Sequence, residues 1–350
     1  MAAPSLLPDF YARATWDGLN LSQTGVVFEQ YVRQQPTLAA ACPKVGIGYF
    51  WYDSLGTYLR GAKALENIAA GELLCTLPTA SLLSEYTVGN STMQAITEAL
   101  TREAAERASR AQAAHSARKR SRNRFAPDVR TMITLLVLRE TARGRSPHKP
   151  YFACLRGHNV DAVPMLWGES SPRWRTANGP LRSQAAEARA SVDNYYRQIV
   201  LDVIERFAPV LSEGLGCGGE HGTCDRDTLA RTYSYEQFAR VYAVVMARDW
   251  VLPMYGRSRP FLAPILDMLN FGQVGIRVHF DDAKHAFVAV STRAVTAGSE
   301  LLFYYGTMCK EEWINTYGFS PQEAHPCADK LSTQLAGRAK KPSGTTRFRT

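Results

Sequence analysis

The sequence lacks an apolar run long enough to cross a membrane, and the mainly apolar run at 133–138 has only the length of a core segment. Its N-terminus lacks the basic and apolar regions of a secretory signal. The signatures GxxxxGK[ST], HExxH, GxSxG and CxxC are missing, as is a GxGxxG that opens a helix. These absences argue against the common nucleotide-binding, metalloprotease and serine-hydrolase classes. We expect an intracellular protein, of the cytoplasm or nucleus, with no membrane association.

Cysteine is scarce, with seven residues at scattered positions. An odd, scattered set favours free thiols in a reducing compartment over a disulfide framework. Only Cys217, His221 and Cys224 have a metal-like spacing, and these three would need a fourth ligand to hold zinc. A solvated loop is the favoured interpretation of this glycine-rich stretch, and no metal is expected.

Positive charge is confined to two segments. The net charge is +9; residues 101–124 hold eight basic and two acidic side chains, and residues 336–350 hold five basic ones, so the rest of the chain sums to −2. A nucleic-acid partner is therefore expected only through 101–124. That stretch is either a solvated arginine-rich insert, a nuclear localisation signal or an RNA-contacting patch. With 350 residues, 45% of them hydrophobic, the chain can build a packed core.

Local patterns predict strands at both ends of the chain and helices between them. The predicted β-segments are 45–52, 58–65, 72–77, 261–266, 276–280, 285–290 and 301–305. The predicted helices are 26–34, one after Pro127, 181–207, 235–250 behind a Ser234 cap, and 308–317 up to Gly318. This order indicates an α+β domain interrupted by a helical insert.

Three segments carry the functional signal when they are read together. They are RGAKALENIAAGELL at 60–74, LAPILDMLNF at 262–271 and GSELLFYYG at 298–306, with YGF following at 317–319. With the arginine of VMARDW at 245–250, they resemble SET-domain protein methyltransferases in order and spacing. The subgroup they resemble has a helical insert and includes the Rubisco large-subunit lysine methyltransferase and the actin-histidine methyltransferase.

The resemblance implies a SET fold, made of small β-sheets with a C-terminal pseudoknot and interrupted by a mostly α-helical insert. It places the two parts of the SET domain at 25–80 and 256–325, and the insert at 81–255. A basic tail would occupy 326–350, where the usual C-terminal substrate-binding domain is absent or truncated. The threaded C-terminal segment would bring Asn270 and Tyr305 together.

The resemblance also implies S-adenosylmethionine as cofactor, a protein lysine as substrate and a monomeric enzyme. Tyr305 would be the catalytic residue, orienting the amine in line with the methyl group rather than acting as a strong base. Trp250 and Tyr304 would contact the substrate. The implied cofactor-binding residues are Gly61, Ala62, Lys63, Arg248, Asn270, Phe271 and Phe319.

Physical chemistry supports some of these roles and leaves others open. Small residues at 61–64 let a flat, charged cofactor lie against the backbone, and Lys63 suits its carboxylate. Arg248 lies on an apolar helix and needs a carboxylate partner, from the cofactor or from the fold. An aromatic ring at Trp250 suits a lysine stem, although core filling is an equal alternative. Asp267 is either a structural acceptor for nearby backbone groups or a surface residue.

Two departures from the family pattern keep alternatives open. Phe271 stands where the family has histidine, and Cys309 and Lys310 stand where a Ser-Asn pair is usual. A protein-histidine methyltransferase, or a degenerate SET protein that binds partners without catalysis, is therefore also considered.

Overall fold

The computed structural model describes residues 21–53, 57–89, 93–114, 129–143, 146, 148–156, 160–217 and 222–327. The chain divides into two compact units. The first is drawn from Met1–Asn159 and Ser191–Gly306, and the second from Val160–Ala190 and Thr307–Thr350. Among the described residues, no helix has the length and apolar character that a membrane span requires.

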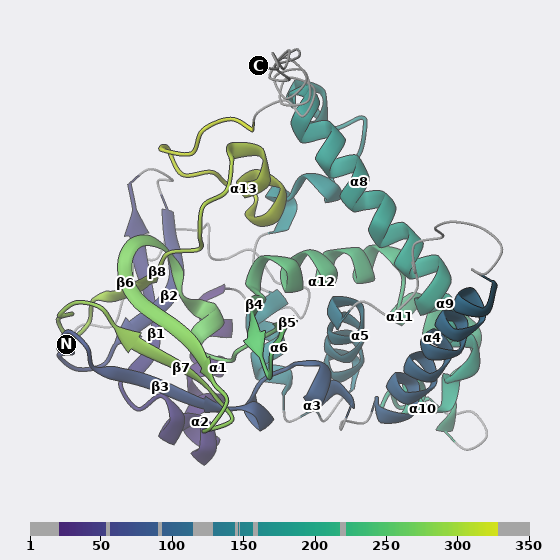
Figure 1. Ribbon diagram of the computed structural model, residues 1–350, viewed down its shortest axis with the longest axis horizontal. Helices are drawn as coiled ribbons and strands as arrows, with labels where there is room; N and C mark the ends of the chain where they lie inside the picture. Colours follow the sequence, from purple (N-terminus) through teal and green to yellow (C-terminus); the bar gives the residue numbers. More distant parts are fainter. Residues whose placement is uncertain are drawn as a thin grey trace, which may run out of the picture. The chain divides into compact units, whose positions relative to one another are not determined.

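The first unit contains a six-stranded sheet in the order β1-β2-β8-β6-β7-β3 and a separate two-stranded sheet, β4-β5 (Figure 1). All pairings are antiparallel except that of β6 with β8, which is parallel. The strands are β1 Val45–Tyr52, β2 Thr57–Ala64, β3 Leu73–Pro78, β4 Trp250–Met254, β5 Arg257–Phe261, β6 Asn270–Asp281, β7 Ala286–Ser291 and β8 Glu300–Phe303. Because β8 lies between β2 and β6, the three motif segments become neighbours in space.

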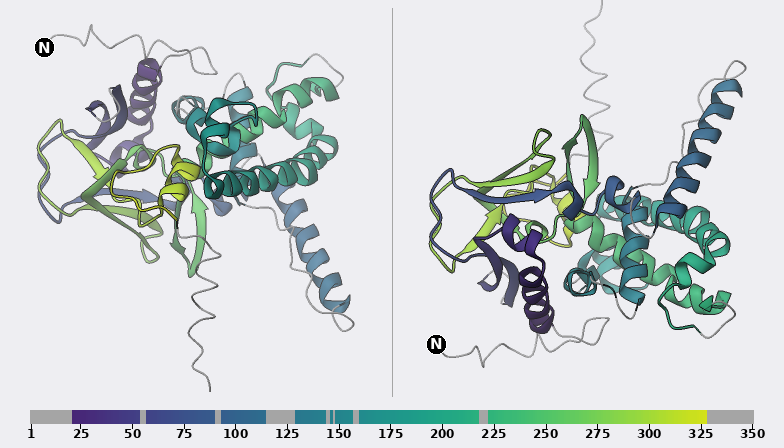
Figure 2. Two further views of the ribbon diagram at one scale, coloured as in Figure 1. Left: turned by 90° about the horizontal axis from the view of Figure 1, so that it is seen from above. Right: turned by 90° about the horizontal axis from the view of Figure 1, so that it is seen from below.

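Helices make up most of the rest of the first unit (Figures 1 and 2), and of these α1 and α2 pack against β1 and β3. Helix α5 is buried along most of its length and packs against α12, whose N-cap Ser234 accepts a hydrogen bond from the Gln237 amide. The helices that lie wholly in this unit are α1 Leu21–Gln34, α2 Pro36–Ala41, α3 Glu85–Gly89, α4 Gln94–Ala114, α5 Val129–Ala142, α6 Lys149–Arg156, α9 Leu201–Arg206, α10 Ala208–Ser212, α11 Arg226–Thr232 and α12 Tyr235–Arg248.

The second unit contains α7 Pro172–Thr176, the first part of α8 Gly179–Tyr195, and α13 Lys310–Tyr317. Helix α13 ends at Gly318, whose φ is +79°, and a Cβ there would lie 2.7 Å from the Cβ of Ala162. Both the left-handed backbone and the close approach require glycine. Glycine at this position therefore fixes where the YGF segment leaves the helix.

Most predicted elements are confirmed. The strands at 45–52 and 58–65 and the hairpin after Ile276 form as expected, and 181–207 is α8, a π-helical turn and α9 in succession. The strand predicted at 261–266 is wrong, because Ile265 has a φ of +76° and turns the chain after a single bridge at Leu262. Of 101–124, α4 covers residues up to Ala114, and the remainder lies outside the described residues.

The expectation of free thiols is wrong for six of the seven cysteines. The disulfides join Cys42 to Cys75, Cys217 to Cys224 and Cys309 to Cys327, and Cys154 is a buried free thiol. The first pair is 33 residues apart in sequence, so only the tertiary fold brings its members together. The cysteine argument for a reducing compartment therefore loses its basis.

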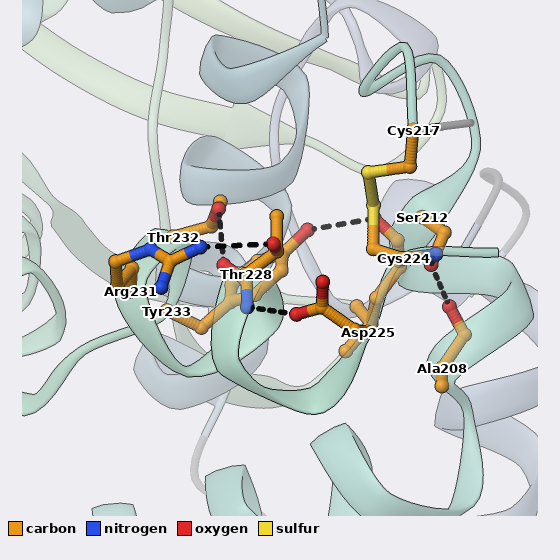
Figure 3. The surroundings of a disulfide bond; sticks show 10 residues. Ala208, Ser212, Cys217, Cys224, Asp225, Thr228, Arg231, Thr232 and Tyr233 are labelled. Atoms are coloured by element: carbon orange, nitrogen blue, oxygen red, sulfur yellow. Dashed lines mark hydrogen bonds between the residues drawn. A yellow bond between two sulfur atoms is a disulfide. The ribbon is translucent and has the colours of Figure 1, made fainter. Parts of the chain in front are cut away.

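The Cys217–Cys224 bond closes the glycine-rich loop beside α11 (Figure 3). The Cys224 amide donates to the Ser212 hydroxyl at 2.8 Å, and Asp225 caps α11 by accepting from the Thr228 amide at 2.6 Å. The third member of the metal-like spacing, His221, lies outside the described residues. The disulfide and these two hydrogen bonds fix the described residues on either side of the loop.

The disulfides make a simple prediction about thiol count. Alkylation of the denatured chain without reductant should modify one cysteine, Cys154, and alkylation after reduction should modify all seven. Mass spectrometry of the intact protein measures both numbers. Modification of all seven without reductant would contradict the disulfide assignment.

Candidate active site

The side chains of the three motif segments meet around Asn270, at the start of β6. Its Nδ2 donates to the Arg60 carbonyl at 2.9 Å and to Glu300 Oε1 at 2.8 Å. The other oxygen of Glu300 accepts from the Tyr52 hydroxyl at 3.0 Å. A Cβ on Gly61 would collide with Glu300 Oε1 and lie 2.9 Å from Asn270 Nδ2. Glycine at 61 is buried and therefore lets the Glu300 and Asn270 side chains come close to the backbone of β2.

Tyr305 lies two residues beyond β8 and turns towards the segment before Asn270. Its hydroxyl donates to the Leu269 carbonyl at 2.5 Å. The ring packs edge-on against Phe271, with centroids 5.8 Å apart, and lies 6.1 Å from the ring of Phe303. Burial raises the pKa of Tyr305 to about 12. At neutral pH this side chain is a fixed hydrogen-bond donor and not a base.

Arg248, the last residue of α12, reaches the same segment. Its Nη1 donates to the carbonyl of Asp267 at 2.7 Å. The Asp267 side chain is 3% exposed and accepts from the Tyr151 hydroxyl, while Oδ1 has no hydrogen-bond partner among the described residues. The surface alternative for Asp267 is thus wrong, because its carboxylate is buried and accepts from the Tyr151 side chain.

Burial raises the pKa of Asp267 from 3.8 to about 7, against the lowering effects of the Tyr151 hydroxyl and of Arg248. Between these two pH values the folded chain keeps a proton that the unfolded chain releases. The free energy of unfolding should therefore fall by about 1.4 kcal/mol per pH unit as pH rises through this window. The Asp267→Asn variant lacks this titrating group. Its free energy of unfolding, measured by denaturant unfolding from pH 5 to 8, should therefore fall less steeply with pH than that of the wild type. If the free energy of unfolding fell equally steeply with pH in the variant and the wild type, Asp267 would not be the group that retains this proton.

Three further predicted residues, Lys63, Ala62 and Trp250, lie in the sheets of the first unit. Lys63 pairs with Glu300 in the β2–β8 register, and Ala62 is fully buried. Trp250 is 9% exposed and packs on Phe303 and Phe287, at centroid distances of 4.7 and 5.1 Å. This position supports core filling and also joins Trp250, through Phe303, to the Tyr305 ring.

The remaining predicted residues are Tyr304 and Phe319. Tyr304 is 46% exposed, and its ring lies 6.0 Å from Phe271. Phe319 belongs to the second unit, where it packs on Trp313 and Tyr317. The substrate role of Tyr304 and the adenine-packing role of Phe319 stay predictions.

Glu300 is the residue that the sequence reasoning missed. It stands in the third motif, directly before Leu301, where an acidic residue at the start of a strand suggests solvent exposure. Its burial follows from the position of β8 between β2 and β6. The signal that could have found it is Gly61, two residues before its strand partner Lys63, because a small residue on the same face leaves room for a neighbouring side chain.

One group of side chains has the types and spacing of metal ligands. In the described part of the chain, Cys309, Glu312 and Cys327 form one group with suitable atoms within 4.8 Å of one another. The two cysteines are joined to each other, which leaves a single carboxylate. This group therefore offers no ligand set for a metal in its oxidised form.

The sequence was compared with those of known proteins. No family model matches the sequence. N-lysine methyltransferase setd6 of Xenopus laevis is 25% identical over 312 residues, which cover 83% of this chain and 58% of that protein. SETD6 of Homo sapiens is 24% identical over 265 residues, which cover 74% and 47%. The chain thus spans about half the length of the curated relatives it matches.

Solved structures show the same fold. The SET domain of LSMT bound to lysine and AdoHcy matches with a TM-score of 0.56 and 14% identity, over 87% of this chain and 58% of that one. Rubisco LSMT bound to AdoMet matches with a TM-score of 0.52 and 13% identity, over 86% and 57%. The predicted α+β SET architecture is confirmed. The chain has the fold of the Rubisco LSMT SET domain and is distantly similar in sequence to the SETD6 N-lysine methyltransferases.

Proposed function

We propose that the chain is an S-adenosylmethionine-dependent protein-lysine N-methyltransferase. The observation that carries this proposal is the Tyr305 hydroxyl, held on the Leu269 carbonyl one residue before Asn270. The SET fold, the names of the relatives and the ligands named with the solved structures support the same assignment.

The residues around Asn270 fit the amino-acid end of S-adenosylmethionine. Because Gly61 has no Cβ, the Glu300 carboxylate and the Asn270 amide lie close to the backbone of β2. Lys63 in β2 and Arg248 on α12 are the basic residues that the resemblance assigns to the cofactor. When bound, S-adenosylmethionine supplies a methyl group activated by a sulfonium.

The chain's own part in the reaction is orientation. The Tyr305 hydroxyl, with its proton retained, and the carbonyls of this segment fix where polar hydrogens of an incoming amine point. Holding nucleophile and methyl carbon in line at short range supplies most of the rate gain in such a displacement. Desolvation of a bound lysine would lower the pKa of its ammonium group, which favours the neutral, nucleophilic amine.

The assignment can be tested by following the methyl group. The purified chain is incubated with methyl-tritiated S-adenosylmethionine and a protein extract, and the labelled proteins are hydrolysed to amino acids. Label in methyl-lysine above the Tyr305→Phe background is the expected result. Label in methyl-histidine would support the histidine-directed alternative. No label above that background would contradict the proposal and favour a partner-binding SET protein.

A protein substrate and an intracellular site of action belong to this same proposal. An intracellular location is weakened by the three disulfides, because such bonds persist mainly in oxidising compartments. The thiol count predicted above, measured on chain isolated from cells without reductant, therefore also tests the location.

A further inference from the structure

Glu300 carries a half-buried carboxylate whose hydrogen-bond partners are both neutral. The Asn270 amide donates to one oxygen and the Tyr52 hydroxyl to the other. No cationic side chain of the described residues forms an ion pair with it, and burial raises the pKa of this carboxyl. An anion that is removed from water without a counter-charge is costly, so the fold gains if a cation completes the group.

The surroundings of Glu300 define which cation would fit. Lys63 is its direct partner in the β2–β8 register, and directly opposite residues present their side chains on one face of the sheet. Gly61 lies two residues before Lys63 and therefore on that same face. The Glu300 carboxylate occupies the space that a side chain at position 61 would take. A positive and a negative side chain thus stand next to each other on one face without an ion pair between them in the described part of the molecule.

We propose that Glu300 binds the α-ammonium group of the cofactor's amino-acid end, while Lys63 faces its α-carboxylate. This inference rests on the proposed function and deepens it. A zwitterion presents one positive and one negative group on the same carbon, which matches two opposite charges held side by side. Charge-assisted hydrogen bonds of this type are the stronger ones in proteins. Asn270 and Tyr52 then act as positioning residues that hold the carboxylate of Glu300 towards the ligand.

Calorimetric titration with three ligands tests the assignment. S-adenosylmethionine has both groups, its decarboxylated form keeps only the amine, and 5′-deoxy-5′-methylthioadenosine lacks the amino-acid end. Glu300→Gln keeps the size of the side chain and can still accept from Tyr52. It should weaken the first two ligands about tenfold and leave the third unchanged. Lys63→Met should weaken S-adenosylmethionine and leave the decarboxylated form unchanged.

Glu72→Gln is the matched control, because the Glu72 carboxylate is already neutralised by Lys44. It should leave all three affinities unchanged. Equal binding of S-adenosylmethionine by Glu300→Gln and the wild type would overturn the inference. Equal weakening of all three ligands would overturn it too, because it would show that Glu300 supports only the fold. If the wild-type chain binds none of them, the proposed function itself fails.

Discussion

Replacement of Tyr305 by phenylalanine should lower kcat by about two orders of magnitude and leave the affinity for S-adenosylmethionine nearly unchanged. The variant keeps the ring and its contact with Phe271 but loses the hydroxyl that is fixed on the Leu269 carbonyl. A small loss of alignment at the reacting atoms costs about a hundredfold in rate. Single-turnover kinetics and calorimetric titration measure the two quantities separately.

Tyr196→Phe is the matched control for this substitution. Its hydroxyl also donates to a backbone carbonyl, that of Tyr233, at 3.0 Å, but it lies in the π-helical turn after α8. It should leave kcat and cofactor affinity unchanged. Wild-type turnover in Tyr305→Phe would show that the hydroxyl is not catalytic, and an equal loss in both variants would indicate a general effect on the fold.

Replacement of Asn270 by alanine should have the largest effect on cofactor binding. The amide joins the Arg60 carbonyl to Glu300, so its loss removes a candidate ligand contact and also releases the carboxylate next to it. Two polar groups disturbed together correspond to about 3 kcal/mol, or about a hundredfold in Kd. Titration of the purified variant with S-adenosylmethionine measures this loss.

Asn67→Ala serves as the control, since Asn67 also bonds a backbone group, the amide of Ala297, in an exposed turn. Without ligand, the midpoints of thermal unfolding of Asn270→Ala and Asn67→Ala should agree within a few degrees. An Asn270→Ala chain that binds S-adenosylmethionine as tightly as the wild type would remove Asn270 from the site.

Local patterns were sufficient to predict many of the strands and helix ends. Alternation of Ile276, Val278 and Phe280 with polar residues marks one strand of the β6–β7 hairpin, and Gly318 marks the end of α13. The meeting of Asn270 with Tyr305 was expected only from the family resemblance. Periodicity holds no information about a parallel pairing between β6 and β8, which are separated by β7 and a long connection.

Features that depend on long-range packing were missed for the same reason. The Cys42–Cys75 bond needs α2 to end beside β3, which nothing in the local sequence indicates. Asp267 was placed on the surface as one alternative, because the sequence does not show that Tyr151 comes from another helix to meet it. Glu300 was overlooked because its burial depends on two neighbouring strands. The missed groups are therefore polar residues whose environment is made by distant segments.

Thermal unfolding of the purified chain, with and without S-adenosylmethionine, tests the central claim most directly. A ligand at about a hundred times its Kd adds about 2.7 kcal/mol to the free energy of unfolding. The account predicts that the unfolding midpoint rises by several degrees. An unchanged midpoint at millimolar S-adenosylmethionine would contradict the account and leave a SET fold that binds partners without methyl transfer.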